Sequence, residues 1–138
     1  MGNPPQGISN IIRGFFQGEF SGTSNTLRYC SMGGNITQLT ENDVALIHDY
    51  TIKIKRVRYI ISGNTKNAAL NLSLRDDNAD VTGTTKTTNA GVNESFDSGP
   101  LNYTIDAGSR IAWKVDNSAS SSGTVVVMMY AAYEVLLI

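Results

Sequence analysis

Residues 101–115 read Leu-Asn-Tyr-Thr-Ile-Asp-Ala-Gly-Ser-Arg-Ile-Ala-Trp-Lys-Val. Every second residue from Leu101 to Ile105 is apolar, the turn sequence Asp106-Ala107-Gly108 follows, and the alternation resumes from Ile111 to Val115. Such alternation is typical of strands that are buried on one face only. This stretch therefore predicts two strands that pair antiparallel.

The same pattern of short alternating runs and turn residues fills the chain from Asn25 onward. A chain of 138 residues is the size of one domain with one hydrophobic core. The predicted fold class is therefore all-β, an antiparallel β-sandwich with about eight strands over residues 25–138. Besides the two strands above, strands are expected at residues 27–29, 44–47, 50–61, 70–74, 84–88, 94–97 and 124–138.

Three of these segments carry more specific signals. The apolar phase of residues 50–61 shifts at Lys55-Arg56, which predicts a β-bulge there. The segment Arg75–Asp80 has the turn chemistry of a hairpin. Residues 124–138 are almost wholly apolar, so the last strand is expected to lie centrally in a sheet or to be covered by a partner subunit.

The first 24 residues differ from the rest and predict a separate anchoring arm. Large apolar side chains recur at helical spacing, although glycines weaken any helix. Two interpretations stay open: the arm docks on a neighbouring molecule, or it caps one end of its own sandwich. On the first, deleting residues 1–20 should leave a folded domain that no longer attaches. The proposed anchoring residues are Ile8, Ile11, Ile12, Phe15, Phe16 and Phe20.

Composition and residue types give no basis for catalysis. The formal net charge of -1 lacks the basic excess of nucleic-acid-binding proteins. Cys30 is the single cysteine and is expected to be a buried hydrophobe, and His48 a surface or loop residue. Residues 76–80 resemble the opening of a calcium loop, but Val81 stands where such a loop needs glycine. We therefore expect no enzyme activity, no cofactor, no metal and no nucleic acid.

The chain also has no signal-peptide pattern and no run near the ~20 apolar residues of a membrane helix. It is expected to be made in a cytoplasm and to have no membrane partner.

The densest charge feature is the basic cluster Lys53, Lys55, Arg56 and Arg58. Lys53 and Lys55 are expected to share one face of a strand, and the predicted bulge would bring Arg56 or Arg58 to the same face. Such a row commonly keeps a strand soluble and blocks edge pairing. The alternative is an electrostatic contact with an acidic protein or glycan surface.

The order of motifs resembles the jelly-roll modules of phage and other virus structural proteins. The matching stretches are residues 27–29, 56–61, 71–80, 105–115 and 124–138, with Asp77-Asn78 in place of the usual Asn-Gly turn and Ser109 in place of an Asp. The resemblance implies a jelly-roll sandwich, a homotrimer or similar ring, and a location on the outside of a virus particle. It implies no catalytic residue.

These observations give the hypothesis of a virion structural protein, a capsid decoration or cement subunit made in the host cytoplasm. Its partners would be its own copies and a capsid or other virion protein. Besides the arm, the expected subunit contacts are Val125, Val127 and Met129. The alternative is a receptor- or glycan-binding fibre head that would use exposed loops, with surface contacts at Asp76, Asp77, Asn78 and Asp80.

Overall fold

The computed structural model describes residues 11–136, which form two antiparallel-dominated sheets packed as a β-sandwich. The first sheet has the strand order β10-β6-β13-β1-β3, with β11 also paired to β6. Its strands are β1 (Ile11–Gly22), β3 (Gly33–Gly34), β6 (Ile52–Ser62), β10 (Glu94–Asp97), β11 (Tyr103–Ile105) and β13 (Val125–Leu136). The predicted all-β sandwich is thus confirmed.

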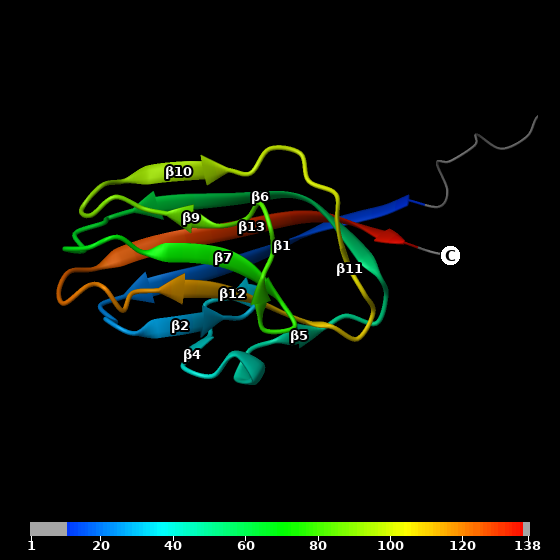
Figure 1. The fold of residues 1–138 in the computed structure, drawn as a ribbon, viewed down its shortest axis with the longest axis horizontal. Coiled ribbons are helices and arrows are strands. Elements are labelled where there is room, and N and C mark those ends of the chain that lie inside the picture. The colour runs from blue at the N-terminus through cyan, green and yellow to red at the C-terminus, as the bar shows by residue number, and fades with distance from the viewer. Residues whose placement is uncertain (1–10, 137–138) are drawn as a thin grey trace, which may run out of the picture.

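The second sheet has the strand order β4-β2-β12-β7-β8, with β5 paired to β12 and β9 paired to β7. Its strands are β2 (Leu27–Cys30), β4 (Thr37–Gln38), β5 (Leu46–Ile47), β7 (Asn71–Asp76), β8 (Ala79–Asp80), β9 (Lys86–Thr87) and β12 (Arg110–Asp116). The 3-10 turn η1 (Glu41–Asp43) lies between β4 and β5. In Figure 1, β7 passes in front of β13 and β1, as expected for stacked sheets.

The core fills the space between the sheets with the inward-facing residues of each strand. Trp113 of β12 and Tyr59 of β6 are fully buried and meet edge to face, with ring centroids 5.9 Å apart. The Tyr59 hydroxyl donates to the backbone carbonyl of Thr84 at 2.6 Å, so its polar end is satisfied inside the core. Cys30 is also buried there, and burial raises the pKa of its thiol to about 12. The thiol is therefore a core hydrophobe.

Strand β1 corrects the prediction of a separate arm over residues 1–24. Residues 11–22 pair with β13 along their whole length, from Ile11 opposite Leu136 to Gly22 opposite Val125. This part of the expected arm is a strand of the sandwich itself, and its residues are not helical. Alternation at a period of two explains it, since Phe16, Gly18 and Phe20 face inward. Ile8 lies outside the described residues.

The predicted pairing of residues 101–105 with 111–115 is also wrong. Strand β11 pairs with β6 in the first sheet, whereas β12 pairs with β2, β5 and β7 in the second. The turn at Asp106–Gly108 therefore carries the chain from one sheet to the other. A local turn signal cannot distinguish a hairpin from such a crossing, because both need a reversal of direction.

Other local predictions are confirmed. In the pairing of β6 with β13, Ala132 lies opposite Arg56 and Tyr133 opposite Ile54, which leaves Lys55 as the extra residue of a bulge. Strands β7 and β8 form the predicted hairpin. Its two turn residues, Asp77 and Asn78, have φ values of 47° and 66°, as a type I′ turn requires.

The segment around residues 44–47 differs from its prediction. Only Leu46–Ile47 is a strand, and η1 precedes it. Strand β13, by contrast, takes the central sheet position that its apolar sequence allowed, between β6 and β1.

Candidate functional site

The residues expected to contact partners separate into two groups. Phe20, Val125, Val127 and Met129 are buried in the core of the single chain. They are therefore wrong as partner contacts, because their surface is already covered by their own sandwich. Phe16 is half-buried and stacks on Tyr133 with ring centroids 4.6 Å apart.

Two members of the predicted set lie on the surface of β1. Phe15 is 67 % exposed and Ile12 is 51 % exposed. For Ile11, the structure gives the backbone pairing alone.

Along each strand of the first sheet, residues that point into the core alternate with residues that point to the outer face. Its three long strands align there in cross-strand rows: Phe15, Ala132 and Arg56 form one row, and Gln17, Tyr130 and Arg58 form the next. A third row consists of Glu19, Met128 and Ile60, of which Ile60 is 47 % exposed. Aromatic and aliphatic side chains thus lie side by side on a surface that residues 11–136 leave exposed.

A hollow of about 650 Å³ lies in the middle of this outer face. The small side chain of Ala132 is flanked in its row by Phe15 and Arg56, which leaves room above the sheet. We call this surface the aromatic–arginine face. It is lined by Phe15, Gln17, Arg56, Arg58, Ile60, Tyr130 and Ala132.

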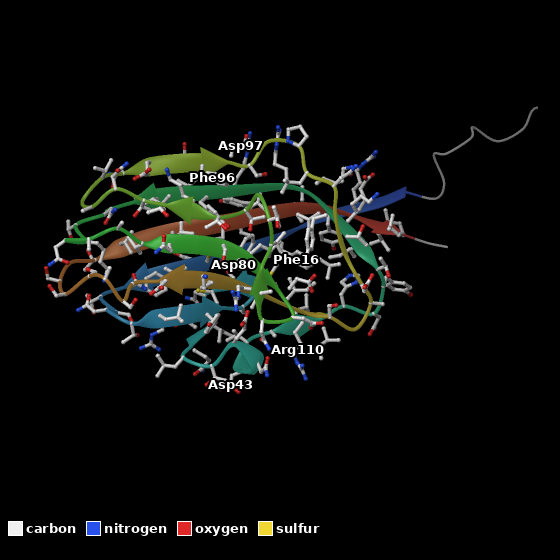
Figure 2. The ribbon with its side chains drawn as sticks, viewed as in Figure 1. Phe16, Asp43, Asp80, Phe96, Asp97 and Arg110 are labelled. Atoms are coloured by element: carbon white, nitrogen blue, oxygen red, sulfur yellow. The ribbon has the colours of Figure 1, made fainter. Side chains whose placement is uncertain are left out.

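Two arginines of this face share one carboxylate. Arg58 donates from Nε and Nη2 to Asp97 Oδ2 at 3.2 and 3.0 Å, and Arg56 Nε lies 3.1 Å from Asp97 Oδ1. Figure 2 shows Asp97 at the β10 edge of the sandwich. The backbone N–H of Gly99 and then these guanidinium groups lower the pKa of Asp97. One carboxylate balances one of the two cations, so the pair keeps positive charge and free N–H donors.

On the opposite outer face, the strands β7, β8 and β12 of the second sheet carry a polar, internally paired network. Arg75 donates to Glu41 Oε2 at 2.8 Å and to Asp80 Oδ1 at 2.6 Å, and its guanidinium lies 5.8 Å from the ring of Tyr29. Lys114 and Ser73 also bind the Asp80 carboxylate. This network ties η1 to the sheet.

The predicted loop contacts have roles within the chain. Asp80 belongs to the polar network. Figure 2 labels it on the sheet that is nearer the viewer. The Tyr103 hydroxyl donates to Asp76 Oδ2 at 2.9 Å, and Asp77 Oδ1 accepts from the Arg110 backbone N–H at 2.8 Å. The Asn78 carbonyl accepts from Arg75 at 2.6 Å. Asp77, Asn78 and Asp80 remain exposed, whereas Asp76 is partly buried.

His48 lies in the loop after β5, as expected, where its Nδ1 accepts from the Tyr50 backbone N–H at 3.1 Å. Within residues 11–136, no group of three His, Cys, Asp or Glu side chains is arranged to hold a metal ion. The same residues contain no helix that is long and apolar enough to cross a membrane.

No family model matches this chain, and the search of curated proteins finds no match. The sandwich and its two unlike outer faces are therefore the observations on which function has to be argued.

Sequence reasoning missed the apolar residues of β13 that face outward. It proposed Val125, Val127 and Met129, whereas Val126, Met128 and Tyr130 point outward. Both alternating sets of β13 are apolar, so its period does not show which set faces the core. The basic residues of β6 could have located the face from the sequence, because charged side chains lie on the outer side of a sheet. The pairing register then shows which residues of β13 and β1 lie beside them.

Proposed function

We propose that this chain is a structural subunit of a virus particle, a capsid decoration or cement protein that acts by burying its aromatic–arginine face against neighbouring protein. The observation that carries the proposal is the exposed apolar surface on the three long strands of the first sheet, where Phe15 of β1 and Ile60 of β6 lie on either side of Tyr130 of β13. Contiguous exposed apolar patches on folded proteins mark interaction sites. The basic cluster of β6 rims this patch, which favours the contact interpretation over a purely solubilising row.

The strand order supports the resemblance to virus jelly-roll modules. The chain passes repeatedly between the sheets, and its eight principal strands fall into the orders β1-β13-β6-β10 and β2-β12-β7-β9. A jelly roll is a double sheet of eight strands built from two Greek keys. We infer from this order that the sandwich is a jelly roll. The fold alone does not specify function, so the outer face remains the main argument.

Deleting residues 1–20 no longer tests this proposal. That deletion removes most of β1, which pairs with β13 and contributes Phe20 to the core. Loss of attachment would then follow from unfolding. Point changes on the outer face are the better test, because exposed residues there can change without disturbing the core.

The first experiment compares self-association of the wild type and Phe15→Asp by sedimentation velocity. Burying a charge at a contact without a partner is unfavourable, so the variant should sediment as a smaller species at equal concentration. Leu39→Asp is the matched control, since Leu39 is similarly exposed but lies beyond β4 in the second sheet. Equal association of all three proteins would contradict a role for this face in contacts between copies.

A second experiment asks whether the chain belongs to a virus particle. Antibodies raised against the purified chain, coupled to gold, should label the outside of particles in electron micrographs of the native source. Particles that stay unlabelled while the chain remains in the unsedimented fraction would contradict the virion location.

One observation favours the second candidate, a glycan-binding fibre head. The hollow brings Phe15 and Tyr130 together with Arg56, Arg58 and Gln17, and sugar rings bind to aromatic faces with polar groups beside them. For this candidate we propose the hollow on the sheet face as the sugar site, in place of the loops. The loop after β9 is held internally, since the Asn89 backbone N–H donates to Glu94 at 2.7 Å.

Ligand-detected NMR with glucuronate-containing oligosaccharides tests this second candidate. Saturation should pass from the protein to the sugar, and Ala132→Leu should abolish the signal by filling the hollow while Leu39→Asp keeps it. Equal signals for wild type and Ala132→Leu would contradict a sugar site in this hollow.

A further inference from the structure

The outer face of the first sheet carries more cations than carboxylates, in a chain whose formal net charge is -1. Its cationic residues are Arg13, Lys53, Lys55, Arg56 and Arg58, and its acidic residues are Glu19, Asp97 and Glu134. Glu134 lies 3.5 Å from both Arg13 and Lys55, and Asp97 holds Arg56 and Arg58. The remaining surface of the chain must therefore carry an excess of acid.

Part of that acid is collected at one end of the sandwich. Three turns meet there: the Gly108 backbone N–H donates to the His48 carbonyl at 2.9 Å, and the backbones of Asp77 and Arg110 are also joined at 2.9 Å. Each turn presents one exposed aspartate, and we call Asp49, Asp77 and Asp106 together the aspartate end. Arg110 is the exposed cation beside them. Figure 2 shows Arg110 at this end of the molecule.

The symmetry of a contact between copies follows from these charges. A two-fold contact brings the same patch of both copies together, so Arg56 and Arg58 of each copy would face arginines of the other. Like charges placed opposite each other across an interface cost several kcal/mol. A head-to-tail contact avoids this cost, because the basic face of one copy then meets the acidic end of the next.

We propose that the occupant of the aromatic–arginine face is the aspartate end of a second copy of this chain. The aspartates pair with Arg56 and Arg58, while Phe15 and Tyr130 are buried beneath the contact. This inference rests on the proposed function and names the surfaces that its self-assembly uses. Repeated head-to-tail contacts close into a ring when the rotation per copy allows it, and a trimer is one such ring.

Charge reversal on either surface, and then on both, tests the pairing. The variants are Arg56→Glu with Arg58→Glu on the face, Asp49→Lys with Asp106→Lys on the end, and the chain that combines all four changes. Sedimentation velocity gives the dissociation constant of self-association. Each double variant should weaken association at least ~10-fold, and the combined chain should recover most of that loss, because opposite charges again face each other.

Folding and milder changes are controlled separately. Thermal unfolding checks that each variant is folded, and Arg56→Gln with Arg58→Gln should weaken association less than the reversal does. Failure of the combined chain to recover, with each double variant folded, overturns the inference. So does a wild type that is monomeric at every concentration tested.

The proposed function fails on different results. Suppose that Phe15→Asp disrupts association but that charge reversal of the aspartate end has no effect. The aromatic–arginine face then still forms the contact, but the aspartate end is not the surface that it binds. Absence of the chain from particles in the immunolabelling experiment counts against the proposed function whatever the charge variants show.

Discussion

Gly18 is the point where the backbone of β1 lies against the indole of Trp113. A Cβ atom at this position would lie 2.7 Å from Trp113 Cδ1 and 2.9 Å from the Ser31 carbonyl oxygen. Trp113 is fully buried and cannot move aside without displacing the core. The sequence showed this glycine only as a residue that weakens a helix. Its packing role depends on the identity of a residue 95 positions away in the chain.

We therefore predict that Gly18→Ala lowers the free energy of unfolding by about 1–3 kcal/mol, the usual cost of overpacking a core. Urea unfolding followed by Trp113 fluorescence measures the change. Gly33→Ala is the control, because a Cβ there has no neighbour nearer than 3.9 Å. That variant should stay within about 0.5 kcal/mol of the wild type. Equal losses for the two variants would refute the close-approach argument.

Asp80 makes the stability of the protein depend on pH. Burial alone raises the pKa of Asp80, but the hydroxyl of Ser73 and the cations of Lys114 and Arg75 together lower it to about 2. A carboxylate whose folded pKa lies below its unfolded value stabilises the protein above the unfolded pKa, about 3.9. That stabilisation is lost as the pH falls through the folded pKa.

We predict that the free energy of unfolding falls more steeply between about pH 4 and pH 2 in the wild type than in Asp80→Asn. Because the carboxylate is 38 % exposed, solvent screening reduces the difference to about 1 kcal/mol. Urea titrations at a series of pH values measure both slopes, and Asp49→Asn, an exposed loop variant, serves as the reference. Parallel slopes in all three proteins would show that the network around Asp80 does not carry this dependence.

The bulge in strand β6 could be predicted from the sequence, whereas the strand β1 could not. Its apolar phase shifts by one residue, and a period of two can change phase in a continuous strand only through an extra residue. The bulge at Lys55 was therefore predictable. Strand β1 was not, since its apolar residues fit both a helical period of about four and an alternation of two. The choice between them is made by pairing with β13, at the other end of the chain.

The 3-10 turn η1 is held by the Arg75–Glu41 ion pair, whose side chains are 12 % and 8 % exposed. Breaking this pair removes one of the two carboxylates that bind the buried Arg75 guanidinium and releases the carboxylate that holds η1 to it. We predict that Glu41→Gln accelerates hydrogen exchange at the backbone amides of Asp43 and Val44, which bond to Thr40 and Glu41 carbonyls, by about tenfold or more. Hydrogen-exchange mass spectrometry makes the comparison.

The expected effect of Glu41→Gln is local, so the amides of β12 in the core should keep wild-type exchange rates. Asp43→Asn provides the control, because it changes an exposed carboxylate within the same turn. If Asp43→Asn loosens this turn as much as Glu41→Gln does, the ion pair is not what holds it.

At the scale of the whole molecule, the two outer faces have opposite characters, and the sequence alone did not separate them. The basic cluster of β6 and the polar residues of β7 are both visible in the sequence. Their neighbours are not, because Phe15, Tyr130 and Arg58 come together only through pairing between the first, last and central strands. The apolar surplus of the last strand was evident. The sequence did not show which side chains of β13 face outward. The pairing register decides this, and it places Tyr130 on the outer face and Met129 in the core.

This combination of charge and apolar surface predicts a particular dependence of self-association on salt. Ionic contacts are screened as the ionic strength rises, whereas burial of Phe15 and Tyr130 is not. The dissociation constant of the wild type should therefore rise several-fold between about 0.05 M and about 0.5 M NaCl. Arg56→Gln with Arg58→Gln should weaken association at low salt and flatten this dependence.

Phe15→Ala separates the two contributions. It should weaken association by about the same factor at every salt concentration, because it removes apolar contact area and leaves the charges in place. Sedimentation equilibrium over the salt series measures all three proteins under identical conditions. A wild-type dissociation constant that falls with added salt would mean that apolar burial alone drives the contact, and the arginines of this face would then have no part in holding the neighbouring copy.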